Sequence, residues 1–197
     1  MGNPALAPEE RFNFRHYKTW PDSERWELLN GQAWAMSPAP STQHQRLSRR
    51  MFGDLVVFLK GKHCEAFYAP FDVLLPEGDE TDDEVDTIVQ PDIVVYCDSS
   101  KIRDYGARGA PDLAVEILSP STARKDLNEK LRLYERNRVR EYWVIDPGNR
   151  SILVFRPVQD AAAYDEGELR EHGRDWTPLA SRVLEGFSVD PGELFAE

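Results

Sequence analysis

Two short runs of almost purely apolar residues, 93–97 and 113–118, most strongly constrain how this chain of 197 residues can fold. Runs of this length without polar alternation are typical of strands that are buried on both faces. Each run brings one carboxylate with it, because Asp92 stands immediately before the first and Glu116 lies inside the second. Burying an unpaired carboxylate is costly, so both positions predict positive charge nearby.

The two runs are separated by a polar, glycine-containing connector at 98–111. If they pair as an antiparallel hairpin around this connector, Asp92 and Glu116 face each other to within one residue. A shift of one residue would place them on opposite faces of the sheet. Like charges that face each other are destabilising unless an Arg, a Lys or a divalent metal lies between them, and hard carboxylate oxygens suit Mg²⁺.

The remaining pattern predicts a single domain that mixes helices and strands, of the α/β or α+β class with one central sheet. Strands are expected at 26–29 and 32–36, joined by an Asn30-Gly31 turn, and at 67–75, 141–146 and 151–157. One helix is expected from Ser41 or Thr42 to about Lys60 and a second one to about Asn137. We place an N-terminal extension at 1–24 and the domain itself at 25–195.

The hydrophobic content of 41% is enough for one core, and no apolar stretch reaches the length of a membrane span. The N-terminus lacks the basic start and apolar segment of a secretion signal, which favours the cytoplasm. Cys64 and Cys97 lie in apolar, strand-like stretches and are interpreted as small core residues of a cytoplasmic protein, with no disulfide between them.

The net charge of −11 taken alone counts against nucleic acid as a partner. However, residues 77–86 hold seven carboxylates and no base, so the rest of the chain carries only −4. Residues 45–62 and 123–140 are both net basic, and one face can therefore be positive. The acidic run itself is typical of a solvated loop.

Four stretches of the chain resemble a bacterial family of restriction-endonuclease-like proteins, long described as a domain of unknown function, within the PD-(D/E)xK nuclease superfamily. They cover most of residues 25–195 and read WELLNGQAWAMSPAPSTQHQRL, VQPDIVVYCD, PDLAVEILSPSTARKDLNEKLRLYERNRVREYWVIDP and VLEGFSVDPGELF. The resemblance implies a restriction-endonuclease-like core, with a central mixed β-sheet flanked by helices. It also implies metal-dependent cleavage of phosphodiester bonds, with DNA as the expected substrate and with Mg²⁺ or Mn²⁺ held by Asp92, Glu116 and the backbone carbonyl of Ile117.

The chain departs from the parent motif at the lysine, which the motif places two residues after Glu116, where Leu118 stands. In the resembling family the lysine lies on the following helix, at the position of Lys130. Asp126 and Glu129 have the spacing of a capping box, so the helix is expected to begin at Asp126 and to point Lys130 back toward the Glu116 strand. The resemblance implies a catalytic lysine; the alternative is an exposed Asp126–Lys130 ion pair.

Other candidates are weaker. His44 could contact substrate or water, Glu27 could complete the outer shell of the metal, and Asp126 is a further candidate for the active site; the alternative is that they are ordinary polar residues. Phosphate contacts are expected from three arginines of the first long helix, Arg46, Arg49 and Arg50. A homodimer would let two sites cut two strands. The rival hypotheses are a nuclease-fold module that binds nucleic acid without cutting it, and an interaction protein whose acidic loop docks a basic partner.

Overall fold

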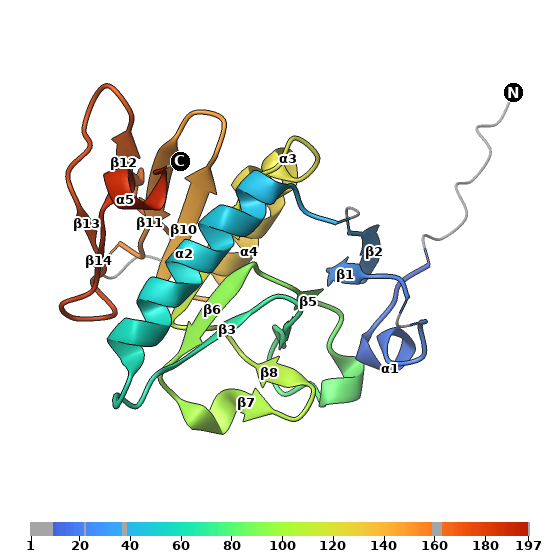
Figure 1. The fold of residues 1–197 in the computed structure, drawn as a ribbon. Coiled ribbons are helices and arrows are strands. Elements are labelled where there is room, and N and C mark those ends of the chain that lie inside the picture. Colours follow the sequence, from blue (N-terminus) through green and yellow to red (C-terminus); the bar gives the residue numbers. More distant parts are fainter. Residues whose placement is uncertain (1–9, 22, 37–38, 159–162, 197) are drawn as a thin grey trace, which may run out of the picture.

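The computed structural model describes residues 10–21, 23–36, 39–158 and 163–196 (Figure 1). Within these ranges the strands form two six-stranded sheets and one two-stranded sheet. The mixed α+β class is confirmed, but the second large sheet was not expected from the sequence. Its strands are short, and three of them lie in segments that the sequence suggested were loops or parts of other strands.

The first sheet has the strand order β12-β11-β10-β9-β6-β3. Only β9 and β10 run parallel, and the other neighbours are antiparallel. Its strands are β3 (Glu65–Tyr68), β6 (Ile93–Tyr96), β9 (Leu113–Ile117), β10 (Glu141–Asp146), β11 (Ser151–Phe155) and β12 (Glu168–Glu171). The two-stranded sheet pairs β13 (Leu179–Ala180) with β14 (Ser188–Val189).

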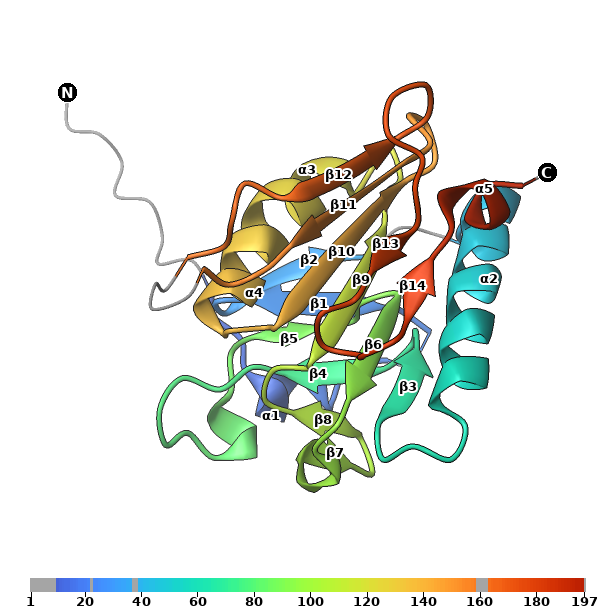
Figure 2. The same cartoon turned by 90° about the vertical axis from the view of Figure 1, so that its left-hand side faces the viewer.

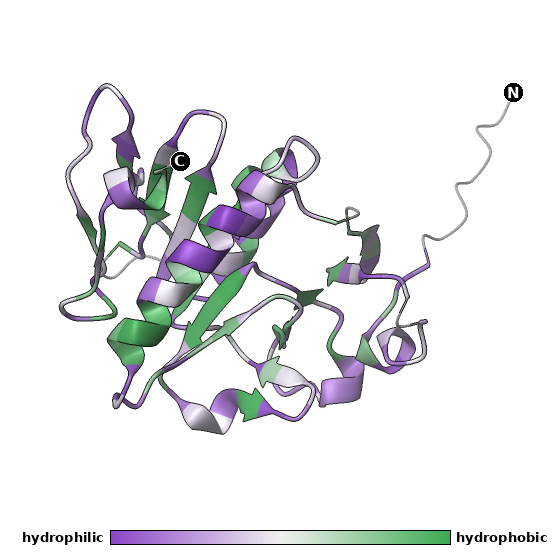
Figure 3. Ribbon diagram, viewed as in Figure 1, coloured by the Kyte–Doolittle hydropathy of each residue, from purple (hydrophilic) through white to green (hydrophobic). Residues whose placement is uncertain are grey.

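Helices cover both faces of the first sheet, as Figure 2 shows. They are α2 (Thr42–Leu59) on one face and the continuous run α3 (Ala123–Lys125), η3 (Asp126–Lys130) and α4 (Leu131–Arg136) on the other. Ser41 caps α2 by accepting the amide of His44 at 3.2 Å, as predicted. The buried stripe of α2, namely Leu47, Met51, Leu55 and Leu59, packs on the sheet, and its largely hydrophilic outer face is visible in Figure 3.

The second sheet has the order β2-β1-β5-β4-β8-β7 and shares a core with the α4 face of the first. Its strands are β1 (Trp26–Leu29), β2 (Gln32–Ala35), β4 (Asp72–Leu74), β5 (Ile88–Val89), β7 (Ile102–Arg103) and β8 (Gly106–Arg108). The predicted Asn30-Gly31 hairpin is confirmed, with φ of 50° and 78° at its two turn residues. This hairpin places β1 beside the helical run.

The predicted pairing of the two apolar runs is confirmed. Ile93 lies opposite Val115 in the antiparallel β6–β9 ladder, so the next position along places Asp92 opposite Glu116. All four residues of β6 and all five of β9 are buried. Asp92 and Glu116 therefore lie opposite each other at the end of the ladder where β6 begins and β9 ends.

Two local predictions were wrong. The expected strand at 67–75 is divided at Ala69-Pro70 into β3 and β4, which belong to different sheets, because proline cannot donate to a ladder. The connector at 98–111 contains η2 (Ser99–Lys101) and the paired strands β7 and β8.

The second helix also begins earlier than predicted. It starts at Ala123, and Asp126 is a buried residue of the π-helical turn η3 instead of an N-cap. The Asp126–Glu129 spacing was therefore not a capping box. Short π-helical segments inside α-helices are often found at functional sites.

Cys64 and Cys97 form a disulfide, which corrects the prediction that they are separate core residues. They lie one position beyond the Glu65–Tyr96 pair of the β3–β6 ladder and so face each other. A separation of 33 residues in the sequence concealed this proximity, which depends on strand register.

The acidic run is largely engaged with the chain's own residues. Asp83 pairs with Lys18 at 2.5 Å and with Arg15 at 3.5 Å, and Asp86 pairs with Arg11 at 2.9 Å. The run includes η1 (Asp82–Glu84) and lies against α1 (Phe14–Tyr17), whose Phe14 is buried. These contacts tie the described part of the predicted N-terminal extension to the second sheet. No helix within the described ranges is long and apolar enough to cross a membrane.

Candidate active site

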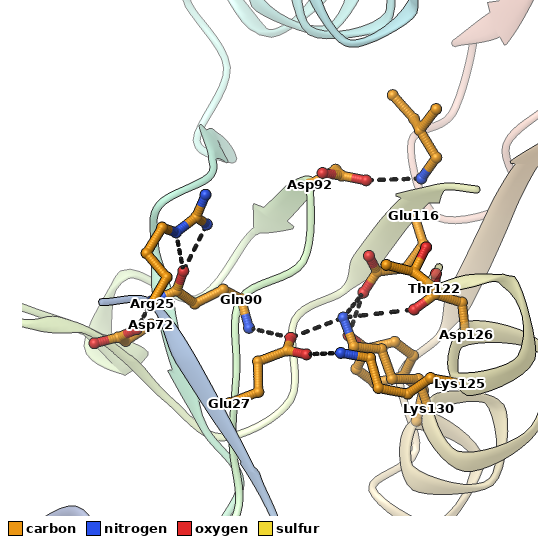
Figure 4. A network of polar contacts seen from close by, with 12 residues as sticks. Arg25, Glu27, Asp72, Gln90, Asp92, Glu116, Thr122, Lys125, Asp126 and Lys130 are labelled. Atoms are coloured by element: carbon orange, nitrogen blue, oxygen red, sulfur yellow. Dashed lines mark hydrogen bonds and ion pairs between the residues drawn. The ribbon is translucent and has the colours of Figure 1, made fainter. Parts of the chain in front are cut away.

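The centre of the candidate site is the ammonium group of Lys130, which is 2% exposed (Figure 4). Its Nζ lies 2.7 Å from Oε1 of Glu116 and 2.8 Å from Oε1 of Glu27. The hydroxyl of Tyr134 donates a second hydrogen bond to the same Glu116 oxygen at 2.9 Å. Glu27 is completely buried, and its other oxygen pairs with Lys125. The lysine thus joins two carboxylates from separate sheets.

Asp92 lies on the opposite side of Glu116 from this lysine. Its Oδ2 accepts the amide of Ile117 at 2.8 Å and lies 3.2 Å from Nε2 of His44. Burial lowers the pKa of His44, but the carboxylate of Asp92 outweighs this effect and raises that pKa above its usual value.

The backbone explains why these side chains converge. Glu116 lies in β9, Asp92 immediately precedes the neighbouring strand β6, and Glu27 lies in β1 of the other sheet. Asp126 and Lys130, four residues apart, both point inward from η3 and are 3.8 Å apart. The amide of Gln90 anchors Glu27 by donating to its Oε1 at 2.9 Å.

Burial raises the pKa of Glu116 well above its usual value, and the charges of Asp126, Asp92 and Glu27 add to the rise beyond what Lys130 offsets. Burial likewise raises the pKa of Asp126. Burial would also raise the pKa of Glu27, but Lys130 and Lys125 outweigh it and hold that pKa below its usual value. At Glu116 and Asp126, the two lysines therefore do not offset the cost of burying a negative charge.

The donor set fits a divalent cation of the Mg²⁺ type. With every carboxyl ionised and His44 neutral, the four carboxylates Glu27, Asp92, Glu116 and Asp126 face two ammonium groups, which leaves a formal charge of −2. Oδ1 of Asp126 is buried without a hydrogen-bond partner among the described residues. Mg²⁺ prefers one or two carboxylates, carbonyl oxygen and retained water, which Asp92, Glu116 and the Ile117 carbonyl can provide.

These carboxylates do not form an all-protein cage. Across the described ranges, the group of three or more candidate ligands whose donor atoms all lie within 4.8 Å is His63, Cys64 and Cys97, away from this site. A cation at the acidic site would therefore keep several water ligands, which hydrolysis requires.

The structure brings most of the predicted residues together. Asp92, Glu116, Lys130, Glu27, Asp126 and His44 all belong to one connected group. Arg46 and Arg49 are exposed on α2. Arg50 instead donates to the main-chain carbonyls of Leu194, at 2.9 Å, and Ala196, so it is occupied at the C-terminal end of the chain.

Sequence reasoning missed three members of the site: Lys125, Gln90 and Tyr134. Lys125 and Tyr134 lie in the same predicted helix as Lys130, at positions five before and four after it. In a regular α-helix, four residues apart indicates a shared face, which could have found Tyr134. The π-helical turn changes the direction in which Lys125 points relative to Lys130, so regular helical spacing does not predict its position. Gln90 contacts Glu27 through its main-chain N–H, which any residue except proline could provide.

A comparison with solved structures identifies the fold. The structure matches a solved structure titled "Crystal structure of a putative nuclease belonging to DUF820 from Anabaena variabilis ATCC 29413" with a TM-score of 0.70. The match covers 92% of this chain and 95% of that one, at 21% sequence identity. At this identity the similarity establishes a shared fold.

The sequence comparisons are more specific. A relative from Synechocystis sp. (strain ATCC 27184 / PCC 6803 / Kazusa), named "Uncharacterized protein slr1290", is 28% identical over 160 residues, which are 80% of this chain and 77% of the relative. Residues 14–192 match the Uma2 family model, described as "Putative restriction endonuclease", and the chain belongs to this family. The predicted resemblance is thereby confirmed, and membership supports a nuclease-like protein.

Proposed function

We propose that this protein is a Mg²⁺-dependent endonuclease that hydrolyses phosphodiester bonds in DNA. The observation that carries the proposal is the position of Lys130, whose buried ammonium group lies 2.7 Å from Glu116, the carboxylate that faces Asp92 across the ladder. Two acidic ligands with an adjacent lysine are the elements that metal-assisted phosphodiester hydrolysis needs. The family match supports the same class of reaction.

Asp92, Glu116 and the Ile117 carbonyl would hold the metal in this proposal. When bound, Mg²⁺ would lower the pKa of a water ligand and stabilise negative charge on the phosphate. The carboxyl of Glu116 suits this role because a bound Mg²⁺ would favour its ionised form, which burial disfavours. His44 positions Asp92 through the 3.2 Å contact with Oδ2, the oxygen that also accepts the Ile117 amide.

Lys130 would orient the attacking water and stabilise charge. An ammonium group has three N–H donors, and Glu116 and Glu27 take two of them. At 3.8 Å, Asp126 is too far for a hydrogen bond, so the third donor is available to water or phosphate. Burial lowers the pKa of Lys130, but Glu116, Glu27 and Asp126 outweigh it and raise the pKa well above its usual value, so Lys130 acts as a cation and not as a general base.

A second candidate function is nucleic-acid binding without cleavage. Lys130 is tied into ion pairs with two carboxylates, and this observation favours a purely structural role for the lysine. The overall charge of −11 also weakens the case for tight binding to DNA. The two functions differ in whether a phosphodiester bond is broken.

A cleavage assay separates them. Single-stranded and double-stranded DNA are incubated with the full chain in Mg²⁺, in Mn²⁺ and in EDTA. We expect metal-dependent cleavage that Asp92→Ala and Glu116→Gln abolish, whereas Asp98→Asn at the far end of β6 retains it. Cleavage that persists in Asp92→Ala would show that the site is elsewhere or that a contaminant cuts.

A homodimer and a cytoplasmic location are further parts of the proposal. A dimer would place two sites on two strands, and light scattering of the purified protein measures its mass. Disulfides are rare in reducing compartments, so a cytoplasmic protein would keep Cys64 and Cys97 largely reduced. Alkylation of cell extracts under denaturing conditions would show which form is present.

A further inference from the structure

A polar groove of about 460 Å³ lies beside the candidate active site, between the β1–β2 hairpin and the α3–η3–α4 run. The helical side contributes Arg124, Arg132 and Arg136 together with Asn128. All four residues line the groove, so they lie along the same side of the helical run. Glu129 also lines the groove, and the arginines outnumber it.

Two of these arginines are available for a ligand. No hydrogen bond or ion pair engages the guanidinium groups of Arg124 and Arg132 within the described part of the chain. Arg136, in contrast, donates to Oδ1 of Asn30 at 2.7 Å and pairs with Glu77 at 3.3 Å, which anchors the far end of the row. A row of unpartnered guanidinium groups is suited to phosphate oxygens, which they bind in a bidentate manner.

The opposite wall presents an aromatic surface. Trp34 lines the groove and is 38% exposed, which is unusual for a side chain this large and apolar. An exposed indole beside arginines offers a base a stacking surface within reach of phosphate contacts.

The groove also adjoins the acidic centre. Trp34 lies directly opposite Glu27 in the β1–β2 ladder, so both side chains are on the same face of the hairpin. On the helical side, Arg124 precedes Lys125, whose ammonium group pairs with Glu27. A strand bound in the groove would thus lead toward Glu27 and Lys130.

We propose that this groove binds an unpaired stretch of the nucleic-acid substrate, with phosphates on Arg124 and Arg132 and a base stacked on Trp34. The inference rests on the proposed nuclease function for its choice of ligand. A single strand is favoured over a duplex because base faces are exposed only when the bases are unpaired.

Binding is measured with a fluorescently labelled oligonucleotide, single-stranded or annealed, by anisotropy in EDTA so that no cleavage occurs. We expect Arg124→Ala/Arg132→Ala to weaken single-strand binding about tenfold and to reduce the slope of log K against log salt by about 1.4, or about 0.7 per lost phosphate contact. Trp34→Ala is expected to weaken binding about tenfold and Trp34→Phe much less. The matched control is Arg174→Ala, an exposed arginine in the loop after β12.

The outcomes separate this inference from the proposed function. Unchanged binding and salt slope in the double variant would overturn the groove, even if the wild type cleaves DNA. An equal loss of affinity in Arg174→Ala would likewise overturn it, because the effect would then come from the overall charge of the protein and not from the groove. If the duplex bound more tightly than the single strand, and Trp34→Ala left duplex binding unchanged, the single-strand assignment would be overturned. Loss of binding in the groove variants, in a wild type that cuts no DNA, would support the groove and refute the nuclease.

Discussion

Nζ of Lys130 lies 2.7 Å from Oε1 of Glu116, although 14 residues separate them and they come from a helix and a strand. The same ammonium group lies 2.8 Å from Glu27 on the other sheet. One buried cation therefore links the β9 strand, the β1–β2 hairpin and the helical run. Experiments must separate this structural role of Lys130 from the chemical role that we propose for it.

Replacing Lys130 with Met is expected to abolish cleavage and to destabilise the fold. Removing one partner from a buried ion pair costs about 3–5 kcal/mol, since the carboxylates stay buried without their cation. Loss of a single charge-stabilising donor lowers kcat by about 100- to 1,000-fold. Cleavage rates and urea unfolding measure the two effects.

Lys130→Arg keeps the positive charge and provides the variant that distinguishes them. We expect it to retain much of the stability while its cleavage rate falls, because a planar guanidinium group cannot reproduce the donor geometry of an ammonium group. Lys60→Met, at the exposed end of α2, is the control for loss of a lysine. Full activity in a folded Lys130→Met protein would contradict a catalytic role.

Mg²⁺ is expected to raise the melting temperature of the wild type. A ligand that binds only the folded state stabilises it by about 2.7 kcal/mol when its concentration is 100 times the Kd. The site's formal charge of −2 makes the folded protein the better binder. Asp92→Asn should remove most of this shift, whereas Asp98→Asn should keep it, as calorimetry would show. An equal shift in Asp92→Asn would place the ion elsewhere.

Opening the Cys64–Cys97 disulfide is expected to lower stability. It closes a loop between residues 33 apart, for which chain entropy predicts roughly 3–4 kcal/mol. The expected result is a lower urea midpoint for Cys64→Ser/Cys97→Ser, and for wild type in dithiothreitol. The reductant should leave the double variant's midpoint unchanged. An oxidised wild type no more stable than the double variant would argue against the bond.

The carboxyl of Glu168 should make stability depend on acidic pH. It accepts from Arg156 and Arg170, each at 2.7 Å. Burial raises the pKa of Glu168, but these guanidinium groups outweigh it and hold the pKa below its usual value. Such a carboxyl stabilises the fold above its unfolded pKa of about 4.3, and the gain is lost as pH falls through the lower folded pKa.

Glu168→Gln should therefore be less stable than the wild type near neutral pH, by under about 1 kcal/mol because the pair is partly exposed. The difference should vanish below the folded pKa of Glu168. Thermal unfolding across a pH series measures both curves. A constant gap down to the lowest pH would mean that the charge of Glu168 is not involved.

Much of this arrangement could be predicted because it depends on local pattern. The apolar stripe of α2, the Asn30-Gly31 turn and the buried runs that became β6 and β9 follow from side-chain period and turn chemistry. The length of the connector predicted that Asp92 and Glu116 face each other to within one residue, and the structure fixed the register. The position of Lys130 followed from the family resemblance and not from the residues, whose spacing alone also fitted an exposed ion pair.

What the amino-acid sequence by itself determined was the mixed class of the fold, the pairing of β6 with β9 and the burial of Glu116 within β9, because short-range periodicity is visible in one dimension. Tertiary structure alone decided that Glu27 and Lys125 join the site, that Cys64 meets Cys97, and that a second sheet packs beside the first. These depend on the register and packing of segments far apart in the chain. Such contacts become favourable only when many elements assemble together, so no single stretch of sequence carries them.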